Sequence, residues 1–441
     1  MSTGNSPLTS ESGFVRRAQG VFYGWRLVGA GAFMLMLMSV CVFQGMGLFL
    51  VTLERHFGWS RTQLSLAFSF GRLEGAVLGP VEGFLIDRLG NRRMILIGYT
   101  IMGIGFLMFS RVQSLWQFYA VFVLISLGSG LGGWLAVISL INNWFVRKRS
   151  MAMASTMSGI HLGGFLVPVL AFGLESHGFR VTTFGIGIVL LITAVPVARL
   201  VIRNHPEEHG LRPDGDPPTA ATTQAERATT APSDEQDFTA RQALATPAFW
   251  IITIAHISST ISIVTLSLHL VPKLTDMGLT LTSASLVVLT YTAVALPAQF
   301  VVGFAADRLP KRPLILFFLV LQASSMMVIA FADSVYTAYL FAVMFGIGFG
   351  GTNPLLTAIR GEYFGRKAFA TIMGLSMTPM SITMMVAPPF AGYMFDTTGS
   401  YVVPFTAFSV VGFFGAFPVL FMRRPKAAGV RSDDVSHHSA S

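Results

Sequence analysis

Ionisable side chains inside a long apolar stretch are the residues of this sequence most able to do chemistry. Arg72 and Glu74 lie near the middle of the apolar run 63–86. A charge at bilayer depth costs at least about 2.5–3.5 kcal/mol, so such a residue usually faces a cavity and has a partner. Residues two apart point about 200° from each other around a helix, so these two do not pair simply. We interpret Arg72 as a candidate for binding an anionic substrate and Glu74 as a candidate proton carrier. Structural pairing with neighbouring helices is the alternative for each.

Other polar residues lie within apolar runs. His161 and His256 carry imidazoles that can titrate near neutrality, and we interpret His161 as a second candidate for proton coupling. A neutral, hydrogen-bonded histidine is the alternative. Glu82 is expected to have a gating or structural role. The polar or amphipathic residues that could line a substrate cavity are Gln44, Trp134, Tyr291, Gln299 and Asn353.

A charged turn occurs twice, each time between two apolar runs. Residues 83–96 and 303–316 are identical at 8 of 14 positions. Such an internal repeat is typical of transporters, in which similar halves move about a central site. Aspartates and arginines in these turns could bridge the two halves in one conformation and separate in the other, so we interpret them as gating residues. They are Asp87, Arg88, Arg92, Asp307, Arg308 and Arg312.

The elements that must position these residues are membrane helices. Of the 441 residues, 53% are hydrophobic and 12% are charged, about half the charged fraction of a soluble domain. A membrane helix needs about 20 mostly apolar residues, and helices satisfy their own backbone groups in lipid. The sequence therefore predicts an all-α membrane protein with 12 transmembrane helices in two pseudo-symmetric six-helix bundles. The predicted spans are 26–51, 63–86, 94–110, 117–142, 151–173, 181–202, 249–272, 281–306, 313–331, 335–358, 368–394 and 402–422.

The basic residues predict the topology. With a cytoplasmic N-terminus, Lys and Arg gather at the cytoplasmic helix ends. By the positive-inside rule both termini are cytoplasmic, and we expect a multi-pass protein of a bacterial inner (plasma) membrane. This placement accounts for the formal net charge of +9 without a nucleic-acid partner. The basic residues outside this pattern are Arg55, Arg61, Arg111, Arg180 and Lys273 on the other side and Arg72 within a span.

A polar segment rich in Pro and Thr divides the chain. Residues 204–238 contain few apolar side chains, which predicts a disordered cytoplasmic linker. The expected organisation is a cytoplasmic tail over 1–20, a first bundle over 21–203, the linker, a second bundle over 239–424 and a cytoplasmic tail over 425–441.

Several function classes lack their motifs. The sequence has no Walker A loop, no Cys/His metal spacing, no G-x-S-x-G elbow and no convincing dinucleotide fingerprint. We therefore expect no ATP-driven mechanism, no enzyme activity, no cofactor and no metal. The single cysteine, Cys41, allows no intrachain disulfide.

The first charged turn also carries a family resemblance. The pattern Gly83-x-Leu85-x-Asp87-Arg88-x-Gly90-x-Arg92-Arg93 resembles the loop 2–3 signature of the major facilitator superfamily. Within it, the chain resembles the monocarboxylate transporter and oxalate:formate antiporter branch. The segments that carry this second resemblance are 57–60, 144–152, 246–250 and 363–367.

The resemblance implies the major facilitator fold and secondary active transport, and one departure bears on the substrate. Members of the branch often carry a carboxylate-binding arginine in the eighth span, where counting back from Gly303 places Gln299. The lysine expected of an oxalate carrier in the eleventh span is absent from 374–380. A two-cation oxalate site is therefore not expected, and Arg72 is the only intramembrane cation that the sequence identifies for an anion.

Together these features predict a secondary active transporter that moves a small organic anion, a monocarboxylate, with a proton by alternating access. Efflux of an amphipathic compound is the alternative, and a membrane sensor that binds a ligand without flux is a further one. The expected partners are the substrate, the proton and the lipid bilayer, and we expect a monomer.

Overall fold

The computed structural model describes residues 22–145, 148–209, 211–212, 214, 238–306, 308–364 and 369–425. Within them, the side chains of 72–80, 83, 87, 149–150, 209 and 369–371 are not described. All regular elements of this part of the chain are helices.

The first half of the chain contains six membrane-length passages. The first consists of α2 and α3 joined by a π-helical turn, and the fourth of α6 and α7. The fifth consists of α8 and the first part of α9, and the sixth of the rest of α9. The chain turns back between them at Gly178, whose φ of 76° lies in the left-handed region that favours glycine. The helices are α2 Tyr23–Ser39, α3 Met46–Phe57, α4 Arg61–Leu89, α5 Asn91–Phe109, α6 Leu115–Gly132, α7 Trp134–Trp144, α8 Arg149–Leu162 and α9 Val167–Pro196.

The second half contains a short helix and six long ones. Among the described residues, nine segments are long and apolar enough to cross a membrane, one of which contains both the fifth and sixth passages. Helices α4 and α15 complete the twelve spans expected from the sequence. The helices of this half are α10 Ala240–Leu244, α11 Pro247–Asp276, α12 Leu281–Ala306, α13 Lys311–Ala330, α14 Val335–Phe364, α15 Phe369–Thr398 and α16 Val402–Ala416.

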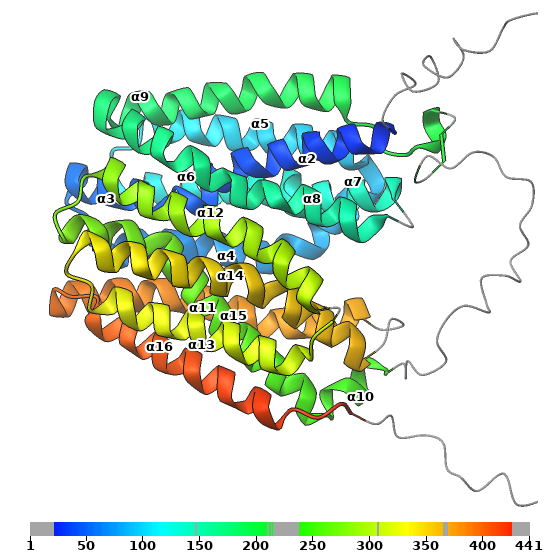
Figure 1. Cartoon of the computed structure of the whole chain (residues 1–441). Helices are drawn as coiled ribbons and strands as arrows, with labels where there is room; N and C mark the ends of the chain where they lie inside the picture. The colour runs from blue at the N-terminus through cyan, green and yellow to red at the C-terminus, as the bar shows by residue number, and fades with distance from the viewer. Residues whose placement is uncertain are drawn as a thin grey trace, which may run out of the picture.

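The two halves lie side by side with their helices running in the same general direction (Figure 1). Helix α2 begins, α10 lies and α16 leads out at one end of the molecule, which we call the linker end. The opposite end is the distal end. Between the halves, α4 packs on α15, α3 on α11, and α12 on α8 and α9. The relation between the halves is therefore set by a few helix pairs.

Corresponding helices of the two halves begin in the same way at the distal end. Ser60 accepts a hydrogen bond from the backbone N–H of Gln63 at the start of α4. Thr280 accepts one from the backbone N–H of Ser283 at the start of α12, 220 positions later. Both are N-caps, and each satisfies a backbone donor that the helix cannot pair.

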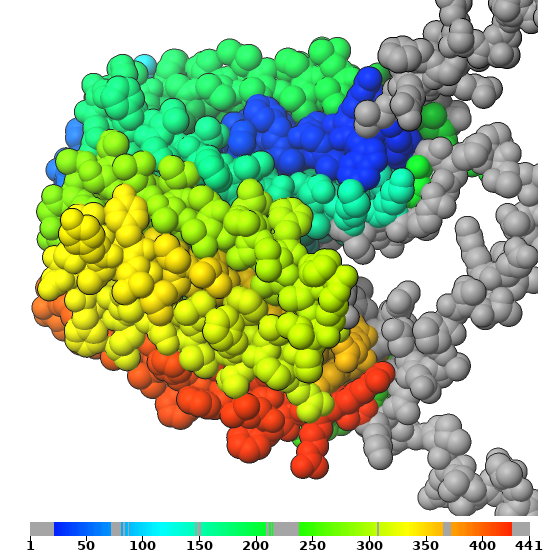
Figure 2. All heavy atoms as spheres, viewed as in Figure 1, coloured from blue at the N-terminus to red at the C-terminus, as the bar shows by residue number. Residues whose placement is uncertain are grey.

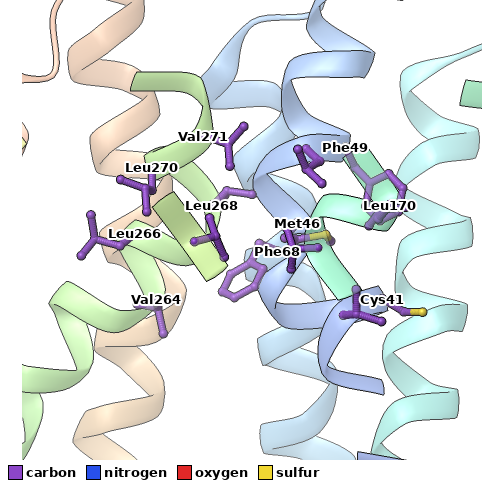
Figure 3. Packing of buried hydrophobic residues seen from close by; sticks show 14 of the residues in the cluster. Cys41, Met46, Phe49, Phe68, Leu170, Val264, Leu266, Leu268, Leu270 and Val271 are labelled. Atoms are coloured by element: carbon purple, nitrogen blue, oxygen red, sulfur yellow. The ribbon is translucent and has the colours of Figure 1, made fainter. Parts of the chain in front are cut away.

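Apolar packing closes the distal part of the interface between the halves. Figure 3 shows Met46 and Phe68 of the first half facing Leu268 of the second. A Cβ on Gly47 would lie 3.1 Å from the carbonyl oxygen of Leu268 and from Cβ of Val271, so α3 and α11 cross in close contact there. A small residue at a crossing lets two membrane helices approach closely.

The described beginning of the segment 204–238 lies against the first half. Asn204 accepts a hydrogen bond from the backbone N–H of Arg92 at 2.9 Å, and Asp214 accepts one from the backbone N–H of Lys148 at 3.0 Å. These contacts hold the chain that leaves the first half against that half. Residues 215–237 lie outside the described residues.

Candidate functional site

A cavity lies between the two halves. Figure 2 shows the halves in contact at the distal end and parted at the linker end. The cavity encloses about 510 Å³, with walls formed mainly by helices of the first half and by α15 of the second. Its volume therefore depends on how the halves sit against each other. The described lining residues are Met38, Ser39, Val42, Phe43, Phe68, Gly71, Glu82, Phe122, Ser126, Ser129, Gly130, Trp134, Leu135, Ile160, Ser381 and Met384.

Glu82 is the charged residue of this described lining. Its side chain is buried, and Oε1 has no hydrogen-bond partner among the described residues. Helix α6 runs so close that a Cβ on Gly130 would overlap this oxygen. A buried carboxyl group without a cationic partner costs much less free energy as a neutral acid than as an anion. Glu82 is thus placed to bind and release a proton at the cavity.

Two pairs of predicted site residues meet across the halves. The hydroxyl of Tyr291 on α12 donates a hydrogen bond to Oε1 of Gln44, just before α3. His161 on α8 lies near Gln299 on α12 and packs edge-on against the ring of Phe349. These polar contacts would have to break or rearrange whenever the halves move apart at this level.

The remaining predicted binding residues are distributed over both halves. Trp134 lines the cavity, whereas Asn353 lies near His256 within the second half. Arg72 and Glu74 lie on α4, whose Gly71 lines the cavity, but their side chains are outside the described residues.

The predicted gating residues form contacts within their own halves. Arg92 donates its Nε to the carbonyl oxygen of Ala198 at 2.9 Å. Arg312 donates its Nε to the hydroxyl of Tyr363 at 2.7 Å. Arg308 lies over the ring of Phe304, and Arg88 is exposed. The side chain of Asp87 and the whole of Asp307 lie outside the described residues.

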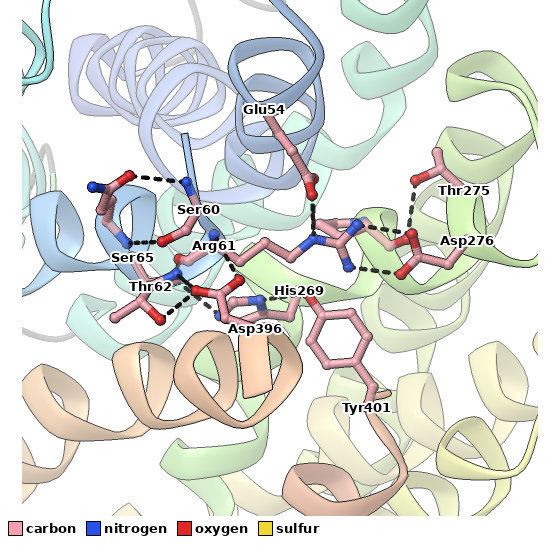
Figure 4. A network of polar contacts seen from close by, with 12 residues as sticks. Glu54, Ser60, Arg61, Thr62, Ser65, His269, Thr275, Asp276, Asp396 and Tyr401 are labelled. Atoms are coloured by element: carbon pink, nitrogen blue, oxygen red, sulfur yellow. Dashed lines mark hydrogen bonds and ion pairs between the residues drawn. The ribbon is translucent and has the colours of Figure 1, made fainter. Parts of the chain in front are cut away.

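A cluster of charges joins the halves at the distal end (Figure 4). Nη1 and Nη2 of Arg61 lie 2.6 and 2.7 Å from the two carboxylate oxygens of Asp276. Nε of Arg61 lies 3.0 Å from both oxygens of Glu54, a residue of its own half. The guanidinium carbon stands 3.8 Å from the ring centroid of Phe395. We call Arg61, Glu54 and Asp276 the distal latch, because the arginine carries the contact from one half to the other.

Next to this latch, a carboxylate of each half binds the start of a helix of the other half. Asp396 accepts from the backbone N–H groups of Arg61 and Thr62 at 3.1 and 2.9 Å, and from the Thr62 hydroxyl at 2.5 Å. Glu175 accepts from the backbone N–H of Thr282 at 3.2 Å and from its hydroxyl at 2.5 Å. The threonines are 220 positions apart in the sequence, so the two cross-half caps are related by the internal repeat. An anion at a helix N-terminus is favourable because unpaired N–H groups gather there.

A neutral histidine supports the latch from the second half. Nδ1 of His269 lies 2.9 Å from the Tyr401 hydroxyl, and Nε2 lies 2.9 Å from the Pro388 carbonyl oxygen. A carbonyl oxygen only accepts, so Nε2 carries the proton and Nδ1 accepts from the tyrosine. Ser65 of the first half lies 3.2 Å from the same Nε2, which brings α4 into this network.

Arg360 on α14 is a second arginine inside the membrane-spanning part, and it corrects the expectation that Arg72 is the only one. Its side chain is 1% exposed. Nη1 lies 2.9 Å from Nδ1 of His256 and 3.4 Å from the sulfur of Met373. Arg360 lies one helical turn before Phe364, where α14 ends, so the sequence alone placed it with the basic residues of a cytoplasmic helix end.

Sequence reasoning also missed the distal latch. Glu54, Arg61, Asp276 and Asp396 each follow or precede an apolar run, which is an ordinary place for a charge. The sequence did contain one signal for this cluster: all four residues fall on the side opposite the cytoplasmic helix ends, where basic residues are few. Among the described residues, no group of three or more His, Cys, Asp or Glu side chains could hold a metal ion.

Comparison with known proteins identifies the family. The Major Facilitator Superfamily model matches residues 32–274 and 248–438. Monocarboxylate transporter 12 of Mus musculus is 22% identical over 91% of this chain and 85% of its own length. Monocarboxylate transporter 11 of Homo sapiens is 24% identical over 92% and 83%, and human monocarboxylate transporter 2 is 23% identical over 86% and 81%.

Solved structures have the same fold. Crystal structures of a bacterial homolog to the human lysosomal transporter Spinster, inward-facing and either occupied or unoccupied, match with TM-scores of 0.66 and 0.67. Their sequences are 15% and 16% identical to this one, over 91% of this chain and 95% of theirs. From its membrane helices, its repeated halves and the family match, the chain is an integral, multi-pass membrane transporter that belongs to the major facilitator superfamily.

Proposed function

We propose that this transporter moves a small monocarboxylate together with a proton. The observation that carries the proposal is the cavity between the halves, which is sealed distally and exposes one carboxyl group, Glu82, in its described lining. A monocarboxylate and a proton together carry no net charge, which lowers the free energy of placing both in an apolar cavity. Similarity to proteins named monocarboxylate transporters supports the choice of substrate class.

Alternating access follows from breaking the distal contacts. In the conformation described here, the distal latch and the two cross-half caps hold the distal end together, while the halves part at the linker end. In the opposite conformation these bonds are broken and the charged turns of the linker end meet. Asp87, Arg88, Arg92, Asp307, Arg308 and Arg312 then form the second gate. The positive-inside rule makes the linker end cytoplasmic.

Protons and substrate are assigned to different residues. Glu82 is the first candidate for the proton, because it is the carboxyl group whose contact with the cavity is described. Glu74 on the same helix and His161 remain candidates. Arg72 remains a candidate for the substrate carboxylate, with Gln44, Trp134, Tyr291, Gln299 and Asn353 as polar or amphipathic residues that complete the site.

The test is uptake of radiolabelled monocarboxylates into proteoliposomes with and without an inward proton gradient. Wild type is expected to accumulate at least one acid only with the gradient. Glu82→Gln is expected to lose this accumulation but to retain exchange of labelled for unlabelled substrate, since exchange requires no net proton release. Glu208→Gln, which removes an exposed carboxylate at the linker end, is the matched control and should behave like wild type. Gradient-driven accumulation by a folded Glu82→Gln variant would exclude Glu82 as the proton carrier.

One observation favours efflux of an amphipathic compound as a second candidate. Most of the described cavity lining is apolar or aromatic, and Glu82 could pair with a lipophilic cation. Failure to take up any monocarboxylate, together with proton-driven extrusion of a lipophilic cation from the same vesicles, would favour this function.

A further inference from the structure

We propose that Arg360 provides a carboxylate-binding site in the second half, oriented by His256, that holds the substrate anion during transport. The proposal rests on the monocarboxylate function proposed above and assigns the binding of its anion. It starts from the burial of an arginine that has no acidic partner among the described side chains. The bonds of Arg360 are to an imidazole nitrogen and a thioether sulfur, and neither carries a negative charge.

The free part of the guanidinium has the geometry that a carboxylate requires. Nε and Nη2 of Arg360 are buried and have no hydrogen-bond partner among the described residues. These two nitrogens share one edge of the planar group and donate along parallel directions. Such an edge binds both oxygens of a carboxylate at once, which is the strongest arrangement open to an arginine. A halide or a neutral hydroxyl compound would satisfy it less well.

The other side of the guanidinium is held by an oriented hydrogen bond. Arginine has only donors, so Nδ1 of His256 must accept the bond from Nη1, which lies 2.9 Å away. A neutral His256 then carries its proton on Nε2, on the side away from the arginine. His256 thereby helps to fix the plane of the guanidinium, as supporting residues do in preorganised binding sites.

A polar face of α14 leads to the arginine. Asn353, Thr357 and Arg360 follow one another at spacings of four and three residues, so they lie on one face of the helix. Asn353 is half-buried and Thr357 is exposed, whereas Arg360 is buried. Because Met373 of α15 lies against the guanidinium, a displacement of α15 during the change of conformation would alter access to Arg360.

Two variants and a control test the assignment in the full-length protein. Binding is measured as the increase of the unfolding temperature in detergent on adding pyruvate, with methyl pyruvate as the neutral probe, and uptake is measured separately in proteoliposomes. Arg360→Gln is expected to weaken pyruvate binding at least about tenfold, since a bidentate charged contact is lost. Arg360→Lys keeps the charge but loses the two parallel N–H donors, so its affinity for pyruvate should lie between those of wild type and Arg360→Gln. Arg241→Gln, an exposed arginine of α10, should match wild type.

The outcomes separate this inference from the proposed function. If wild type binds and takes up pyruvate and the folded Arg360→Gln variant does so equally well, the site is wrong while the function stands. If Arg360→Gln does not fold, unchanged binding by Arg360→Lys overturns the bidentate site in the same way. If wild type neither binds nor takes up any of a panel of monocarboxylates, the proposed function fails, and the site fails with it. Equal responses to methyl pyruvate and pyruvate also refute an anion site.

Discussion

Removing one charge of the distal latch should open the distal end. Asp276→Asn preserves the shape of the side chain but replaces the carboxylate, which accepts hydrogen bonds from Nη1 and Nη2 of Arg61, with a neutral amide. A hydrogen bond to a charged group contributes about 1.5–3 kcal/mol when desolvated, and an exposed ion pair about 1 kcal/mol or less. Arg61 is 5% exposed and Asp276 35%, and Glu54 still pairs with the arginine, so we expect a loss of about 1–2 kcal/mol. The ratio of closed to open molecules should fall by a factor of about 5–30.

Distances between spin labels measure this ratio. Trp116 and Tyr336 begin corresponding distal turns of the two halves, 220 positions apart, and are 78% and 87% exposed. Labels at Trp116→Cys and Tyr336→Cys, with the buried Cys41 replaced by Ala, report the separation of the halves by double electron–electron resonance. Asp276→Asn should increase the population at the longer distance. Asp333→Asn, which removes an exposed distal carboxylate that makes no described bond to the first half, is the control. Identical distance distributions for both variants and wild type would refute the latch.

Other contacts allow two further predictions. Gly164→Ala should lower the unfolding temperature and favour the distally open form, because its Cβ would overlap the buried Thr292 of the other half, and overpacking costs about 1–3 kcal/mol. Gly185→Ala, where a Cβ meets open space, should leave the unfolding temperature unchanged. An equal decrease of the unfolding temperature for both variants would contradict the overpacking of Gly164. Tyr363→Phe removes the acceptor of Arg312 within the second half, so it should cost about 1 kcal/mol or less in thermal unfolding and leave the distal spin-label distance unchanged. A change of that distance would mean that the contact belongs to a gate in this conformation.

The sequence was sufficient for the arrangement of the helices because the relevant signals are local. Runs of apolar residues predict the spans. The repeated charged turns predict two similar halves. Each span and each turn is recognised from neighbours within a few residues, and the repeat from comparing two such turns. No knowledge of the fold is needed for either.

The contacts between the halves could not be predicted in the same way. Arg61 meets Asp276 across 215 residues and Asp396 across 335, and many pairings of surface charges fit the sequence equally well. Arg360 has the opposite difficulty, since one helical turn decides whether an arginine lies in water or inside the protein. Its burial depends on the packing of α11 and α15 around it. The roles of Arg72 and Glu74 stay predictions from the sequence.

The two cross-half caps make the contact between the halves similar to that of a symmetric dimer. In an isologous interface, one surface patch makes the same contact twice, because residue i of one subunit meets residue j of the other and the reverse. Thr62 with Asp396, and Thr282 with Glu175, reproduce that relation inside a single chain. An ancestral half-length protein would have needed only one acid–threonine pair to close a dimer on both sides of its axis. Once the halves are joined, the two copies can diverge, and the distal latch of Arg61, opposite Leu281 in the other half, is such a divergence.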